Sequence, residues 1–161
     1  MLSEGTTTRL RTQLDVLRVI LAHADPLTLD RRPPSGDWSG RENLAHLARH
    51  HDVFVGRLRR ILTEDEPHLG RYRAEDDPEW PTWRTLTVAD AVTRLLASRR
   101  ELIRLLDESA PNDFTRIGVH PVLGRMSLAL WLEFLLLHEA HHLYVVFGSI
   151  RPGAPAPDRA P

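Results

Sequence analysis

The segment from Met126 to Gly148 constrains the fold most, because it is apolar almost all round and yet carries several histidines. A helix with such a surface lies at the centre of a helical domain or contributes to a dimer interface. Side chains four residues apart lie only about 40° apart around a helix, so His138 and His142 point to the same side. We therefore expect a buried helix that presents two imidazoles on one face.

Two imidazoles on an apolar face cost desolvation energy unless something binds them. A divalent metal ion suits this spacing, and hydrogen bonding inside the core is the alternative. Residues 138–142 also match the H-E-x-x-H pattern of metalloproteases. Those enzymes usually take a third ligand further along the chain, where this sequence offers only Asp158 as a carboxylate. A protease is therefore disfavoured.

Three further segments repeat apolar residues with a helical period. They run from about Thr7 to Ala24, from Ser39 to about Leu62 and from Thr87 to about Leu106. The second begins with Ser39 and Glu42, which have the spacing of a capping box, and the third begins with Thr87 and Asp90, which cap it. Because no run of residues is typical of a strand, the sequence predicts an all-α four-helix bundle.

The connections after the second and third helices, Glu64–Leu86 and Ala110–Arg125, are long and contain several prolines and glycines. Loops of this length in a compact domain often form lids or pocket walls. Trp80 and Trp83 lie in the first connection. They either cover a site or, as we expect, anchor the loop on the bundle.

The 161 residues fit one domain, expected over residues 1–150, followed by a disordered tail rich in proline and alanine over residues 151–161.

The formal net charge of −1 argues against binding to nucleic acid or to an anionic membrane. We expect Arg57 and its neighbours Arg59 and Arg60 to be solvated. No secretory signal is recognisable and the apolar segment is interrupted by charged residues and histidines, so we expect a cytoplasmic protein without a membrane span.

The sequence contains no cysteine and no lysine, so a metal ion would be held by histidines and carboxylates. A third ligand is available on the second helix, which carries His46, His50 and His51. His46 and His50 share a face with Asn43, whereas His51 points toward the apolar stripe and is expected to be a hydrogen-bonded core residue. Helical spacing alone leaves the choice between His46 and His50 open.

Two motifs carry a resemblance to a known family. Trp38-Ser39 followed by Glu42-Asn43-Leu44-Ala45-His46-Leu47, and His120-Pro121-Val122-Leu123-Gly124 followed by Ser127, Trp131 and residues 138–142, resemble DinB-like (DinB/YfiT) proteins. The resemblance covers residues 7–148 and implies an up-down-down-up bundle, often dimeric. It also implies that His46, His138 and His142 hold a divalent ion. Many relatives continue with Arg-Gly-Gln after the last ligand, where this chain has Leu143-Tyr144-Val145, so a shared substrate pocket does not follow.

The resemblance implies a metal-dependent reaction with a low-molecular-weight thiol of the mycothiol type, in which the ion lowers the pKa of the thiol. Hydrolysis by activated water and a metal-binding stress-response module without turnover are the alternatives. Zinc or nickel, a small-molecule substrate and a homodimer are expected. Glu139 either orients a metal ligand or relays a proton without binding the ion itself, or it is a solvated or ion-paired residue. In the non-catalytic alternative the ion would be occluded behind Trp80 and Trp83.

Overall fold

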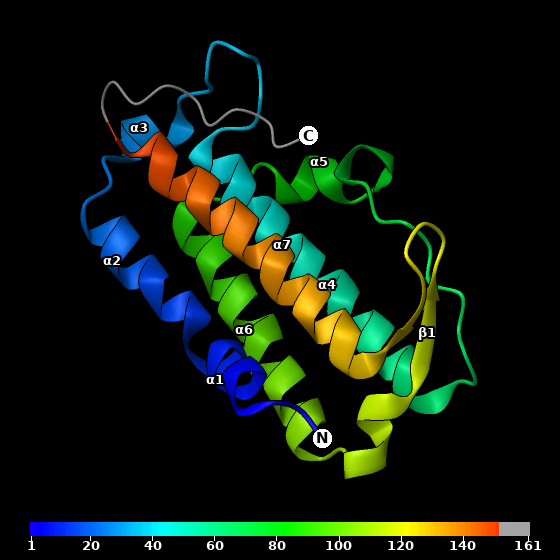
Figure 1. The fold of residues 1–161 in the computed structure, drawn as a ribbon. Helices are drawn as coiled ribbons and strands as arrows, with labels where there is room; N and C mark the ends of the chain where they lie inside the picture. The colour runs from blue at the N-terminus through cyan, green and yellow to red at the C-terminus, as the bar shows by residue number, and fades with distance from the viewer. Residues whose placement is uncertain (152–161) are drawn as a thin grey trace.

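The structure is a computed structural model that describes residues 1–151. Within this part of the chain, four helical rods lie side by side (Figure 1), which confirms the predicted four-helix bundle. The first rod runs up, the second and third run down, and the fourth runs up again. The tail expected from residue 151 onward lies, apart from Arg151, outside the described residues.

The first rod is interrupted, in contrast to the single helix expected from Thr7 to Ala24. Helix α1 (Glu4–Thr12) and helix α2 (Val16–Ala22) are joined by the 3₁₀ turn η1 (Gln13–Asp15). In this turn the side chain of Gln13 donates hydrogen bonds to the Leu136 carbonyl and to Glu139 on the last helix. The short helix α3 (Pro26–Asp30) follows and packs on the second rod.

The second rod, α4 (Gly40–Thr63), begins with the predicted capping box. Ser39 Oγ accepts from the Glu42 backbone N–H at 3.2 Å, and the Glu42 carboxylate accepts from the Ser39 N–H at 3.0 Å. The third rod, α6 (Val88–Asp107), is capped by Thr87, as its sequence indicates. The fourth, α7 (Leu128–Ser149), is capped by Ser127.

The connection between α4 and α6 crosses the outside of the bundle and contains two short helical turns. They are the 3₁₀ turn η2 (Ala74–Asp76) and helix α5 (Trp80–Trp83). Trp80 and Trp83 are buried in the core formed with α4 and α6, so they anchor the loop as expected. Residues 71–75 form part of a cavity wall, which is the role that the length of the loop indicates.

The connection between α6 and α7 departs from the sequence prediction, because it contains a β-hairpin. After the 3₁₀ turn η3 (Pro111–Thr115), strand β1 (Ile117–His120) pairs antiparallel with β2 (Gly124–Ser127). Gly124 has a φ of +72°, a conformation that favours glycine. Two backbone hydrogen bonds join Val119 of β1 to Pro67 and Leu69, so the hairpin holds the α4–α6 connection in place.

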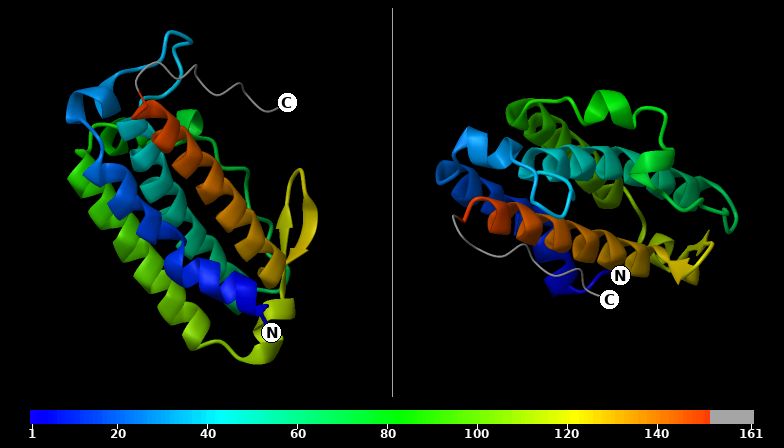
Figure 2. Two further views of the ribbon diagram at one scale, coloured as in Figure 1. Left: turned by 60° about the vertical axis from the view of Figure 1, so that its left-hand side comes forward. Right: turned by 90° about the horizontal axis from the view of Figure 1, so that it is seen from above.

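The core lies between the four rods. Figure 2 shows the hairpin beside the start of α7 and outside the bundle. Trp131 is fully buried there and donates a hydrogen bond to the Gly118 carbonyl at 3.2 Å. In residues 1–151, no helix combines the length and the apolar character that a membrane span requires.

Candidate metal centre

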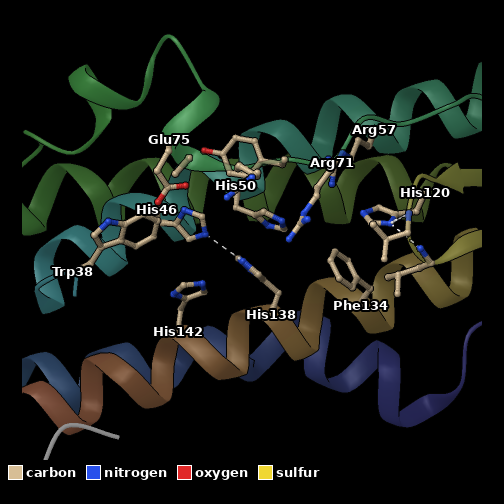
Figure 3. Close-up of a pocket in the computed structure, with 15 residues that line it drawn as sticks. Trp38, His46, His50, Arg57, Arg71, Glu75, His120, Phe134, His138 and His142 are labelled. Carbon is tan, nitrogen blue, oxygen red and sulfur yellow. Dashed lines mark hydrogen bonds between the residues drawn. The ribbon is translucent and has the colours of Figure 1, made fainter. Parts of the chain in front are cut away.

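Helices α4 and α7 are antiparallel neighbours, and each presents histidines toward the other. His46 and His50 lie one turn apart on α4 and are 6 % and 3 % exposed. His138 and His142 lie one turn apart on α7, with ring centroids 4.5 Å apart. The four-residue spacing therefore produces two histidine pairs that face each other across one helix contact (Figure 3).

Three of these four histidines bring one nitrogen each to a common point. The potential ligand atoms of His46, His138 and His142 all lie within 4.8 Å of one another. The Nε2 atoms of His46 and His138 are 3.2 Å apart. Two nitrogens that bind one tetrahedral ion at a bond length of about 2.0–2.1 Å are separated by about 3.3 Å. The His46–His138 pair therefore already has the spacing of two ligands of one ion, and the donor chemistry of all three histidines suits a divalent ion.

The neighbours of the cluster differ in how they orient its rings. Asn43 Oδ1 lies 2.8 Å from His142 Nδ1, so that ring nitrogen donates to the amide oxygen and leaves Nε2 without its proton in the neutral ring. Asn43 is in turn held by hydrogen bonds to the Trp38 and Ser39 carbonyls. The Nδ1 atoms of His46 and His138 are buried and have no partner among the described residues.

Burial keeps the histidines of the cluster neutral. It lowers the pKa of His46 to about 3 and that of His142 to about 2, and neighbouring histidines add to the effect. The pKa values of His138 and His50 lie well below the ordinary value for the same reason. Neutral imidazoles are the protonation state that binds metal ions, and they leave the charge of the ion uncompensated.

The cluster opens onto a cavity of about 500 Å³. Aromatic, basic and histidine side chains from α4, α7, β1 and the α4–α6 connection line it. Besides the three clustered histidines, the wall includes Trp38, His50, Arg57, Arg71, Tyr72, Glu75, His120 and Phe134. Trp80 and Trp83 are not in this wall, so the cluster is not occluded behind them as the non-catalytic alternative requires.

His50 lies beside the cluster, although its nitrogens are not among the three that converge. Its ring stacks on that of His138 with a centroid distance of 3.8 Å and an interplanar angle of 22°. Its Nδ1 is buried without a partner in the described residues. Helical spacing had left His46 and His50 equivalent, and the structure places His46 in the cluster and His50 in the adjoining wall.

Glu139 points to a face of α7 next to the cluster, about 100° around the helix from His138 and about 60° from His142. It is fully buried, forms an ion pair with Arg99, approaches His51 Nε2 at 2.9 Å and accepts a hydrogen bond from Gln13. Burial alone would raise the pKa of Glu139, but His51 and Arg99 lower it below the ordinary value. The contacts favour the ion-pair interpretation of Glu139. His51 is the hydrogen-bonded core residue expected from its position, because its Nδ1 donates to the Leu47 carbonyl.

Several cavity residues were not identified from the sequence as site residues. Arg57 was expected to be solvated, but it is only 8 % exposed and lines the cavity. Arg71 and Glu75 come from a connection without periodicity, so no pattern predicted the direction of their side chains. His120 belongs to a quoted motif, yet nothing in that motif indicated that β1 would carry it into the cavity wall.

Comparisons with known proteins agree with this architecture. The family model described as "DinB superfamily" matches residues 9–146. A protein from Oceanobacillus iheyensis named "Putative metal-dependent hydrolase OB0782" is 29 % identical over 117 residues, which are 71 % of this chain and 66 % of that protein. The match thus spans slightly less than two thirds of the relative's length.

Two solved structures share the fold. YfiT from Bacillus subtilis, described as "a probable metal-dependent hydrolase with an unusual four-helix bundle topology", has a TM-score of 0.75 and 20 % identity, with 93 % of this chain and 86 % of that chain covered. The four-helix bundle protein TT2238 has a TM-score of 0.63 and 22 % identity, with 89 % and 95 % covered.

Proposed function

This chain belongs to the DinB superfamily, and on that basis we propose that it is a metal-dependent enzyme that acts on a small molecule. In this proposal His46, His138 and His142 hold a divalent ion. The observation that carries the proposal is the convergence of their three ring nitrogens at the wall of an open cavity. The names of the Oceanobacillus and Bacillus proteins support it.

A divalent ion held by three neutral histidines acts as a Lewis acid and lowers the pKa of a coordinated water or thiol. The residues of the chain supply the rest of the site. Asn43 fixes the orientation of His142, and Trp38 packs against His46 with a centroid distance of 4.8 Å. Imidazole ligands suit zinc and nickel, which we propose as the metals.

Hydrolysis is the reaction that we propose first. Figure 3 shows the Glu75 carboxylate beside His46, on the side of that ring away from His138 and His142. Among the described residues that line the cavity, Glu75 is the only carboxylate. It is therefore the group placed to accept a proton from an attacking water molecule. Glu139, the acidic residue of the H-E-x-x-H pattern, is paired with Arg99 and is not part of the cavity wall.

Transfer of a low-molecular-weight thiol is the second candidate. Glu75 is exposed and has no hydrogen bond or ion pair within residues 1–151, so no neighbour fixes its carboxylate as a base. A thiol has an ordinary pKa of about 8.5, against about 15.7 for water. A thiol bound to a metal ion therefore loses its proton without a well-positioned general base. The absence of a hydrogen-bond or ion-pair partner for Glu75 among the described residues is the observation that favours this reaction.

Metal content tests the site directly. We expect the protein as purified to contain about one divalent ion per chain, and His46→Ala, His138→Ala and His142→Ala each to lose most of it because two ligands seldom hold an ion. His141→Ala is the matched control, since this exposed neighbour on α7 lies outside the cluster. Elemental analysis after gel filtration is the measurement. Full metal content in all three variants would contradict the proposed ligands.

The metal-loaded protein then separates the two reactions. For hydrolysis we expect Glu75→Gln to lower turnover of an activated ester by about a hundredfold, the usual minimum for loss of a general base. For thiol transfer, measured with an electrophile and mycothiol or glutathione, the same variant should change little. Asp76→Asn, an exposed neighbour, is the control. Absence of metal-dependent turnover in both assays would refute the enzymatic proposal.

A further inference from the structure

The end of the cavity away from the histidine cluster is cationic. Figure 3 shows Arg57 and His120 at this end, with Phe134 between His120 and His138. The Phe134 ring centroid lies 6.5 Å from that of His138 and 6.1 Å from that of His120. The Phe134 ring therefore lies between His120 and the candidate metal centre.

Arg57 is a buried arginine without an acidic partner. Its guanidinium lies over the Trp131 ring at 5.6 Å, and its Nη2 donates to the Gly70 carbonyl. No carboxylate in residues 1–151 lies within ion-pair distance of it. Arg49, two turns earlier on α4, shows the usual arrangement, because it pairs with Asp52, Asp77 and Glu79. Burial lowers the pKa of Arg57, which reflects the cost of an uncompensated charge.

Arg71 approaches the same space from the α4–α6 connection. Its guanidinium points into the cavity between His50 and His120 (Figure 3). It forms no hydrogen bond or ion pair with any residue that the structure describes. Arg57 and Arg71 thus offer several unused N–H donors to one volume, and two guanidinium groups that converge in this way bind oxyanions well.

His120 adds a neutral donor to the same end. Its Nδ1 accepts hydrogen bonds from the backbone N–H groups of Val122 and Leu123, at 3.1 and 3.0 Å. An imidazole nitrogen that accepts carries no proton, so the ring proton of neutral His120 is on Nε2. Its Nε2 has no partner among the described residues, and the side chain lines the cavity.

We propose that Arg57, Arg71 and His120 form a subsite for an oxyanion group, a carboxylate or a phosphate, on the small molecule that reacts at the histidine cluster. The inference rests on the proposed function, because that function places the reacting group at His46, His138 and His142. The substrate is then a small acid whose anionic group binds at the basic end. Phe134 packs under the part of the molecule that connects the two groups.

Binding of simple anions tests the subsite without relying on turnover. The probes are acetate and inorganic phosphate, titrated separately into the full-length protein and followed by NMR through the arginine side-chain Nε–H signals. We expect saturable shifts at Arg57 and Arg71, and at least tenfold weaker binding in Arg71→Gln, because that change removes one guanidinium. Arg100→Gln, an exposed arginine on α6 and the same change of charge, should bind like the unchanged protein.

The two probes identify the anionic group, since the one that binds more tightly represents the natural ligand. Because Arg57 contacts Trp131 and Gly70, Arg57→Met is tested together with its unfolding curve, and Arg71→Gln remains decisive if that variant does not fold. Dissociation constants above about 10 mM for both probes would overturn the subsite.

The His138→Ala variant separates failure of the subsite from failure of the proposed function. We expect it to lose metal and to keep the anion binding. If it loses anion binding while Arg71→Gln retains it, the metal ion holds the anion, and the subsite is wrong while the metal centre stands. If the arginine variant loses anion binding and all three histidine variants keep metal, the subsite stands and the proposed ligands are wrong.

Discussion

Glu139 is buried between helices, so its charge contributes to stability rather than to the chemistry of the cavity. Its ion pair with Arg99 and its contact with His51 join three of the four rods, and Gln13 adds the first. We expect Glu139→Gln to lower the free energy of unfolding by about 3 kcal/mol, because it leaves Arg99 buried without its partner. Urea denaturation measures this change, and elemental analysis should show an unchanged metal content.

Glu133→Gln is the control on the same helix, since Glu133 pairs with Arg9 at the partly exposed surface. This substitution should lower the free energy of unfolding by about 1 kcal/mol or less. The double variant Glu139→Leu with Arg99→Met should be more stable than Glu139→Gln, because it removes both charges together. A Glu139→Gln protein with normal stability and no activity would instead support a catalytic role for this carboxylate.

At the scale of single residues, the sequence predicted side chains on regular helices better than side chains on loops. His46, His138 and His142 could be proposed because the spacing and the family resemblance agree, and the structure brings these three together. Glu75 and Arg71 could not, because an aperiodic loop does not define where a side chain points. Arg57 was misjudged because a charged residue near a helix end is usually solvated, whereas here the connection of residues 64–86 covers it.

The start of α4 depends on an ionised Glu42. Its carboxylate caps the helix and pairs with Arg32 and Arg84. Burial by itself would raise the pKa of Glu42, but the hydrogen bonds from Arg32, Ser39 and Arg84 lower it to about 2. The unfolded chain therefore binds the proton more tightly, and the stabilisation from Glu42 is present above pH 4.5 and is lost as the pH falls toward 2.

We expect this group to contribute about 1–2 kcal/mol to the fall in stability between pH 5 and pH 2, after allowance for its partly exposed partners. The measurement is urea denaturation of the full chain at several pH values. Glu42→Gln should be less stable at neutral pH and should show a correspondingly shallower decline. An identical pH dependence in the two proteins would contradict the assignment.

Among the elements, the helices were predictable and the hairpin was not. Apolar periodicity and N-terminal caps at Ser39 and Thr87 defined α4 and α6 to within about one residue of their observed bounds. Strands β1 and β2 have only four residues each and no sustained alternation. Their pairing depends on tertiary contacts, among them a close approach at Gly118, where an added Cβ would lie 2.9 Å from Ile61 and Trp131 atoms. Local sequence does not contain that information.

At the scale of the whole molecule, α7 carries an apolar stripe on its outer face. Leu130, Leu137 and Tyr144 are 51, 66 and 62 % exposed and recur every seven residues, which keeps them on one side of the helix. The homodimer expected from the sequence stays a prediction, and this stripe is the surface that we expect to form it. Leu137→Glu should shift the protein toward the monomer, because it places a charge in the interface.

Light scattering after gel filtration measures that shift. Leu96→Glu is the matched control, since it introduces the same charge at an exposed leucine of α6. It should leave the molar mass unchanged. A protein that is already monomeric at about 100 µM, or a Leu137→Glu variant of unchanged mass, would contradict the predicted interface.

The two sides of the cavity have different structural origins. Packed helices α4 and α7 present the histidine cluster, whereas a surface connection and a hairpin present Arg71, Glu75 and His120. Leu69 and Ala74 of this connection belong to the core, whereas Arg71, Arg73 and Glu75 are exposed and can be substituted without disturbing it. Under the proposed function, a library randomised at these exposed positions alone is the direct route to altered selectivity, because it leaves the histidine cluster unchanged.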